Sequence, residues 1–220
     1  MEALFGEMIA YDFDKIDTNY LPKEGLGIEN KVVPPKVVVN GSVSYVSQKH
    51  WIQSQTVKEN ILFKQPFDEK KYNDAIKFSK MEEDIKEIVG GDQSMLGDKG
   101  VGLSGGQKTR LMIARALYAD KDIVLMDDPI SALDIHVGTA IMEETVGGYL
   151  KDKTRVISTH AIHFLHHFDY IYIMDAGKII KEGKYDLITQ TDEYKRIVES
   201  IEKEKEAFRK KSGEEKAKND

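Results

Sequence analysis

An α/β fold built on a mostly parallel sheet is the architecture that this sequence predicts. Two short apolar runs, within "DIVLMDDP" at 122–129 and "TRVISTH" at 154–160, have the composition of buried strands. Segments with helical spacing of their apolar residues alternate with these runs along the chain. Continuous apolar strands that alternate with helices are typical of a parallel sheet, so we expect helices on both of its faces.

The first part of the chain predicts a helix, a loop and a hairpin. Residues 1–10, "MEALFGEMIA", have the pattern of the later part of a short helix with no capping residue before it. Residues 11–36 are polar, contain prolines and glycines, and predict a surface loop. The stretch "KVVVNGSVSYVSQ" at 36–48 predicts a β-hairpin, because Asn40–Gly41 is a favoured two-residue turn between valine-rich strands.

The rest of the chain predicts further helices, a strand–turn–strand unit and a charged tail. We expect one domain over residues 1–195 and a helical subdomain inserted at about 50–103. Residues 196–220 are expected to be a linker or tail, because their mixed charges cannot build a core. The expected helices are "TVKENILF" at 56–63, "KKYNDAIKFS" at 70–79, "MEEDIKEIV" at 81–89, one after Gly106 and one at about 135–150, and "YIYIMDAGKIIKEG" at 170–183 is the expected strand–turn–strand.

Composition excludes several classes of function. The 220 residues carry a net charge of -6 with an isoelectric point near 5.6, which argues against nucleic acid as the main partner. The chain has no cysteine, so it offers neither disulfides nor thiolate chemistry. No apolar run reaches the length that spans a bilayer, and no signal peptide is visible at Met1. We therefore expect any membrane role to come through a partner.

Polar side chains follow each predicted strand of the parallel sheet. Gln48 ends the first, Asp127 and Asp128 end the second, and His160 ends the third. Ligands of open parallel sheets bind beyond the carboxyl ends of the strands. A carboxylate there suits Mg²⁺, a second carboxylate could activate water, and a histidine could contact a γ-phosphate. These are the parts needed for phosphoryl transfer from a nucleotide.

The stretch "LSGGQ" at 103–107 predicts a helix start that can hold an anion. Ser104 can cap the helix, and the two glycines allow its backbone to approach a ligand closely. The N–H groups and the positive dipole end of such a helix attract phosphate. The sequence nevertheless contains no G-x-x-x-x-G-K-[ST] phosphate loop.

Together these motifs resemble the nucleotide-binding domain of ATP-binding cassette (ABC) transporters. "LSGGQ" matches the family's signature loop, "IVLMDDP" its Walker B strand and "SALD" at 131–134 its D-loop. Gln48 falls at the Q-loop and His160 at the switch histidine, in the family's order. "GSVSYVSQKHWIQSQTVKENILF" and "DPISALDIHVG" resemble most closely the first such domain of the C subfamily, the multidrug-resistance-associated proteins. The resemblance implies a P-loop NTPase-like fold and a transport-coupled ATPase.

Two departures from the family concern the chain's own ATP site. "MEALFGEM" resembles the helix that directly follows the Walker A loop, so we expect the first strands and the P-loop to be missing. Asp128 stands where active members carry glutamate. Losing one methylene withdraws the carboxylate by roughly 1.5 Å, which should slow a general base that must reach its water. Without those strands, the sheet is expected to leave an apolar face and an edge uncovered.

The resemblance also implies roles for individual residues. In the family, two nucleotide-binding domains pair head to tail, and each signature loop closes over ATP held by its partner. Ser104, Gly105, Gly106 and Gln107 would then contact the γ-phosphate of a nucleotide on the partner, and Asp134 would lie at the seam. Asp127 and Gln48 would hold Mg²⁺, while Asp128, His160 and Gln48 would serve catalysis.

Partners and alternatives follow from the same resemblance. The chain would act with transmembrane domains at the cytoplasmic face of a membrane, and it would be soluble if it is complete as written. A second interpretation is a non-catalytic module that supplies its signature loop to a complete domain. A third is a soluble ABC ATPase outside transport, which the acidic isoelectric point disfavours. Trp51 and Phe63 are expected in the core of the helical subdomain, or else on the surface that meets the transmembrane domains.

Overall fold

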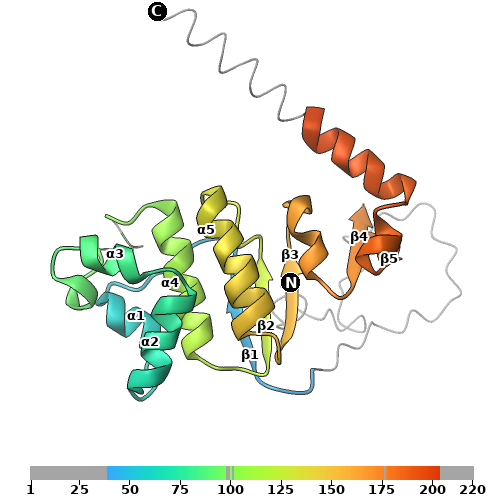
Figure 1. Ribbon diagram of the computed structural model, residues 1–220. Helices are drawn as coiled ribbons and strands as arrows, with labels where there is room; N and C mark the ends of the chain where they lie inside the picture. Colours follow the sequence, from blue (N-terminus) through green and yellow to red (C-terminus); the bar gives the residue numbers. More distant parts are fainter. Residues whose placement is uncertain (1–38, 98–99, 101, 176, 204–220) are drawn as a thin grey trace, which may run out of the picture.

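The computed structural model describes residues 39–97, 100, 102–175 and 177–203 (Figure 1). The helix expected at 1–10, the loop expected at 11–36 and most of the tail from residue 196 lie outside the described residues. Within the described ranges, no helix combines the length and the apolarity that crossing a bilayer requires.

A three-stranded parallel sheet lies at the centre of the described structure. Its strands are β1 (Val43–Val46), β2 (Ile123–Asp127) and β3 (Thr154–Ser158), in the order β1-β2-β3. Val46 pairs with Met126, which pairs in turn with Ile157. The prediction of a parallel sheet is therefore confirmed for these strands.

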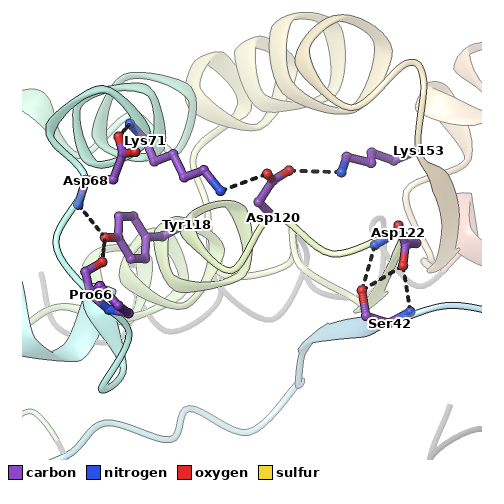
Figure 2. Close-up of polar contacts among 8 residues, drawn as sticks. All are labelled: Ser42, Pro66, Asp68, Lys71, Tyr118, Asp120, Asp122 and Lys153. Atoms are coloured by element: carbon purple, nitrogen blue, oxygen red, sulfur yellow. Dashed lines mark hydrogen bonds and ion pairs between the residues drawn. The ribbon is translucent and has the colours of Figure 1, made fainter.

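The hairpin expected at 36–48 is wrong in its described part. Asn40 is not in a strand, and β1 pairs with β2, which lies far along the chain. The Asp122 carboxylate explains this pairing, because it accepts hydrogen bonds from the backbone N–H of Ser42 at 2.7 Å and from its hydroxyl at 2.8 Å. These bonds draw the start of β1 to the start of β2 (Figure 2).

The described helices that connect the sheet strands cover one face of the sheet, and the expectation of helices on the other face as well stays a prediction. Helix α4 (Gly105–Tyr118) precedes β2, while α5 (Ile135–Ala140) and the π-helix η6 (Ile141–Tyr149) connect β2 to β3. Both connections step in the same direction across the sheet, and right-handed crossovers then place their helices on the same side. The shared core includes residues of one sheet face together with residues of α4 and η6: Val46, Val124, Met126, Leu111, Ile113, Met142 and Val146.

Short helices follow β1 in the stretch where the sequence predicts a helical subdomain, and the bounds of that subdomain stay a prediction. This stretch contains α1 (Val57–Leu62), α2 (Glu69–Phe78), α3 (Glu82–Glu87) and the short η4 (Gly91–Gln93), gathered beside α4 in Figure 1. Thr56 and Glu59 form a capping box at the start of α1, which fixes that helix start locally. The apolar faces of α1 and α2 pack against α4, so this helix belongs to both the subdomain and the sheet core.

Polar contacts tie the helical subdomain to the sheet at the amino ends of the strands, as Figure 2 shows. The Tyr118 hydroxyl accepts a hydrogen bond from the Asp68 N–H at 2.9 Å and donates to the Pro66 carbonyl. The Asp120 carboxylate pairs with Lys71 of α2 at 3.0 Å and with Lys153 before β3 at 2.9 Å. Asp120 therefore joins three segments that are distant in sequence.

A second, smaller unit follows the parallel sheet. It includes the 3-10 helix η7 (Ile162–His167), the antiparallel pair β4 (Ile171–Asp175) and β5 (Lys178–Gly183), and α6 (Tyr185–Ile188). The strand–turn–strand prediction is confirmed. Residues 192–203 are helical, and Ile197 packs against the small core of this unit. The domain boundary at 195/196 stays a prediction.

Candidate functional site

Four predicted site residues lie at one edge of the parallel sheet. Gln48 comes two residues after β1, Asp127 ends β2 with Asp128 directly after it, and His160 comes two residues after β3. Because the three strands run parallel, their carboxyl ends share an edge. We call these four residues the strand-end group.

The two aspartates of the strand-end group are held differently. Asp127 still belongs to β2, and the Tyr45 hydroxyl of β1 lies 3.5 Å from its carboxylate. Asp128 takes a left-handed backbone conformation, with φ of 47°, which aspartate tolerates better than most residues. Its N–H donates to the Ser158 carbonyl at 2.8 Å, and its carbonyl accepts from the Ser131 hydroxyl at 3.0 Å. The turn after β2 is thus fixed to β3.

Oxygen donors at this edge suit a hard cation. Asp127 supplies a carboxylate and Gln48 an amide carbonyl, the donor types that Mg²⁺ takes beside water and substrate phosphates. No set of three or more histidine or acidic side chains forms a metal cage among the described residues. The donor chemistry therefore fits an ion that a bound phosphate helps to hold, rather than a closed metal site.

The "LSGGQ" stretch, which we call the signature loop, begins α4 as predicted. Ser104 is the N-cap of the helix, and its hydroxyl accepts from the Gln107 N–H at 3.2 Å. The Gln107 side-chain oxygen in turn accepts from the Ser104 N–H at 2.9 Å. This capping box leaves the N–H groups of Gly105 and Gly106 at a positive helix end.

A buried ion pair supports the first turn of α4 from the helical subdomain. The Asp84 carboxylate of α3 accepts two bonds from the Arg110 guanidinium, at 2.6 and 2.7 Å. The Gln107 side-chain amide also donates to Asp84, at 3.3 Å. The side chains of Asp84 and Arg110 are only 8% and 13% exposed, so the pair is strongly shielded from water.

The loop of residues 131–134 packs against the signature loop on another side. A Cβ placed on Gly106 would lie 3.3 Å from the Ala132 carbonyl oxygen, which explains a glycine there. Asp134 is the N-cap of α5 and accepts from the backbone N–H groups of Val137 and His136, both at 3.0 Å. These bonds, that of Val137 foremost, hold the pKa of Asp134 below its ordinary value. The signature loop and "SALD" therefore form one surface.

Comparison with known proteins now decides the family. A family model described as ABC transporter matches residues 16–131, which is more than half of the chain. The chain belongs to the ABC transporter family. It is 46% identical over 157 residues to ABC transporter C family member 8 of Dictyostelium discoideum, covering 70% of this chain and 10% of that protein.

Other relatives belong to the same subfamily. Mouse ATP-binding cassette sub-family C member 2 is 46% identical over 151 residues, which cover 68% of this chain and 10% of the relative. ABC transporter C family member 5 of Arabidopsis thaliana is 44% identical over 155 residues, which cover 70% of this chain and 10% of the relative. The chain thus spans about a tenth of the length of these relatives. The subfamily expected from the motifs is confirmed.

In this ABC transporter chain, the predicted site residues fall into two groups. The strand-end group comes from the three parallel strands, whereas Ser104 to Gln107 and Asp134 come from two helix starts that pack together. The side chains of Gln107 and Asp134 are both engaged in capping. Their predicted contact with nucleotide, like that of the other site residues, stays a prediction.

Sequence reasoning missed several residues that position these groups. Asp84, Arg110, His50 and Thr109 all contact the first turn of α4 or its neighbours. Asp84 and Arg110 are 26 positions apart, and His50 and Thr109 are 59 apart. Such pairs follow no helical or strand period, so no local signal in one sequence could have found them.

Two aromatic residues differ from the expectation that they lie in the core. Trp51 is 54% exposed and Phe63 is 36% exposed, and their rings meet edge to face at 5.4 Å. The reason is the Arg115 guanidinium, which lies beneath both rings, 5.3 Å from Trp51 and 5.0 Å from Phe63. Burial lowers the pKa of Arg115 to about 10. The cation fills the space that the rings would otherwise occupy.

Proposed function

We propose that this chain is part of a nucleotide-binding domain of a C-subfamily ABC exporter, which couples ATP binding and hydrolysis to transport through transmembrane domains. The observation that carries the proposal is the capped start of α4. There, two glycines with their N–H groups at a positive helix end pack beside the "SALD" loop. An anion-binding helix end of this kind suits the γ-phosphate of ATP.

The signature loop would act on a nucleotide held by a second nucleotide-binding domain in a head-to-tail pair. Ser104, Gly105 and Gly106 would offer the contacts, while Gln107 would keep the helix start in shape through the capping box. Asp134 would lie at the seam, since its loop packs on Gly106. The Ser104 side chain and Gly105 are exposed, as such a contact requires.

The strand-end group would serve the chain's own ATP site. Asp127 and Gln48 would hold Mg²⁺, which supplies electrostatic stabilisation of the phosphates when bound. Asp128 would orient or deprotonate the attacking water, Gln48 would help position it, and His160 would contact the γ-phosphate. Because Asp128 is shorter than glutamate, we expect slow hydrolysis at this site.

The exposed aromatic pair suits contact with transmembrane domains. Trp51 and Phe63 present apolar surface, and a cavity of about 270 Å³ lies beside Trp51. An exposed aromatic next to a hollow is typical of a protein-binding surface. The residues that line the cavity are Tyr45, Ser47, Trp51, Met112 and Arg115.

A second candidate function is a non-catalytic module that supplies its signature loop to a complete domain. The shortened carboxylate at Asp128 favours it, because the trans-acting loop is fully formed while the base is weak. Immunoblotting of native protein with an antibody to the tail after Glu199 separates the two candidates. A membrane-bound band far above 25.0 kDa supports the exporter, and a soluble band near that mass supports the module.

The proposed contact of the signature loop with a nucleotide on a second domain is tested by measuring the association of the two domains. The chain is mixed with a purified C-subfamily nucleotide-binding domain that contains a P-loop, with and without MgATP, and complex formation is measured by sedimentation. We expect MgATP to promote pairing. Gly105→Asp should weaken pairing at least about tenfold, because its carboxylate repels phosphate. Gly105→Ala is the matched control, since a Cβ there meets only ordinary contacts. Equal pairing by all three chains would overturn the proposal.

A further inference from the structure

We propose that His50 is a positioning residue that couples the segment carrying Gln48 to the signature loop through Thr109. The inference rests on the proposed function, because it concerns how the two halves of that function communicate within one chain. His50 lies two residues beyond Gln48, and Thr109 lies in the second turn of α4.

A directed chain of hydrogen bonds joins the two segments. The Thr109 hydroxyl donates to the Gly105 carbonyl at 3.1 Å, and it lies 2.9 Å from His50 Nε2. A hydroxyl has one hydrogen to donate, so with that hydrogen on Gly105 the oxygen must accept from His50. This arrangement requires a proton on His50 Nε2, which then donates to Thr109. The chain runs from His50 through Thr109 to the first residue of α4.

Burial makes this connection specific. Thr109 is only 4% exposed, so its hydroxyl has little access to water that could replace a lost partner. Gly105, at the other end, belongs to the signature loop and precedes the Gly106 that packs on Ala132. If the segment after β1 moves, His50 pulls on the Thr109 hydroxyl, and this hydroxyl is bonded to Gly105 of the signature loop. Water cannot easily replace either bond.

The opposite side of the same turn is held by the helical subdomain. Asp84 binds both Arg110 and Gln107, and Gln107 closes the capping box on Ser104. With that side fixed, a change in the position of His50 tilts the turn instead of moving it as a whole. The signature loop therefore responds to the strand-end group, which would bind the chain's own nucleotide.

The test uses the full 220-residue chain and two matched pairs of variants. Thr109→Val removes the hydroxyl with little change of shape, whereas Thr109→Ser keeps it. His50→Leu removes the donor from an exposed side chain, so it should fold normally, and His50→Gln keeps a donor at similar reach. Amide hydrogen exchange is followed at Gln107 and Lys108, whose N–H groups donate to the Ser104 hydroxyl and carbonyl.

We expect Thr109→Val and His50→Leu each to speed exchange at Gln107 and Lys108 roughly fivefold, the factor that loss of one net hydrogen bond gives. The double variant should show little further change, because both remove the same connection. Thr109→Ser and His50→Gln should exchange like the original chain. Exchange in the middle of α4, at 111–117, should not change in any variant.

A second readout separates coupling from simple support. The amide resonance of Gly105 should shift when Gln48 is replaced by alanine, and this shift should disappear in the Thr109→Val and His50→Leu backgrounds. A shift that persists in both backgrounds, or unchanged exchange in both variants, would overturn the inference. Neither measurement uses nucleotide or a partner, so failure here is distinct from failure of the association test.

Discussion

Two sides of this chain differ in how well their apolar residues are buried. The helical side consists of α4 and the helical subdomain, and the strand side consists of β3 and the β4–β5 pair. Eight of the fourteen residues of α4 are buried, and the helix packs against α1, α2 and the sheet. On the strand side, β3 lies at the edge of the sheet and Val156 is 40% exposed. In the antiparallel pair of β4 and β5, which we call the β4–β5 hairpin, Tyr172 and Met174 are 57% and 65% exposed. Among the described residues, the larger buried core is on the helical side, whereas the strand side has a small one of Ile171, Ile173 and Ile188.

Because of this difference, we expect the helical side to contribute most of the stability and the strand side to offer surface for interactions. A parallel sheet is normally covered on both faces, and an open strand edge offers unpaired N–H and carbonyl groups. The uncovered edge and face that the sequence predicts stay a prediction, since Leu125, on the same sheet face as Val156, is only 3% exposed. On the helical side, the buried pair of Asp84 and Arg110 supports the signature loop.

Breaking the buried ion pair should have the largest effect on the helical side. Asp84→Ala leaves the Arg110 guanidinium buried without its partner, so we expect a loss of about 4 kcal/mol in the free energy of unfolding. Urea denaturation measures it. Glu83→Ala is the control, because Glu83 lies on the same helix but pairs with Lys86 at the surface. A loss below about 1 kcal/mol for Asp84→Ala would show that this pair is not a main support.

Truncating a buried and an exposed apolar residue tests the comparison directly. Leu111 is 0% exposed, and Leu111→Ala should lower the free energy of unfolding by about 3 kcal/mol. Met174→Ala, in the hairpin, should change it by less than about 0.5 kcal/mol, since Met174 already contacts water. Thermal melts of both variants give the answer. Similar losses would mean that the strand side is as well packed as the helical side.

Ion pairs at the boundary of the helical subdomain should contribute less to the free energy of unfolding than the buried residues do. Asp120→Asn should cost below about 1 kcal/mol, because Asp120 is 43% exposed and water screens its bonds to Lys153 and Lys71. Those bonds, that of Lys153 first, lower the pKa of Asp120 in the folded chain. The stabilisation is thus present at neutral pH and lost as the pH falls below about 4. The advantage of the original chain over Asp120→Asn should shrink progressively in melts as the pH is lowered from 5 through 4 toward the lowered pKa.

Removing apolar surface from the hairpin should have the smallest effect on stability but should change association. Tyr172→Ser combined with Met174→Ser is expected to leave the melting temperature within a few degrees of the original value. It should also reduce concentration-dependent self-association, which light scattering measures. If self-association is unchanged while the protein stays folded, the exposed face with Tyr172 and Met174 does not mediate self-association.

Local signals in the sequence predicted the helices and their starts well. Thr56 with Glu59 and Ser104 with Gln107 are capping boxes over four residues, so each needs only its own neighbours. The parallel sheet was predicted as well, because continuous apolar runs such as 123–127 are typical of buried strands. The family followed from short motifs at the ends of those same elements.

Expectations failed where partners are distant in sequence. The Asn40–Gly41 signal for a hairpin was overridden by Asp122, which binds Ser42 from 80 positions away. The core position expected for Trp51 was taken instead by the Arg115 guanidinium. The π-helical form of η6 over 141–149 was also not predicted, although helix was expected there.

By itself, the sequence determined the helix starts, the strands of the parallel sheet and which polar side chains follow the strand ends, because each depends on spacing within a few residues. Only the tertiary structure decided what holds the signature loop. Asp84 reaches Arg110 across 26 positions, and His50 reaches Thr109 across 59. Side chains so far apart meet only after the sheet and the helical subdomain have packed together, since burial and not periodicity selects these partners.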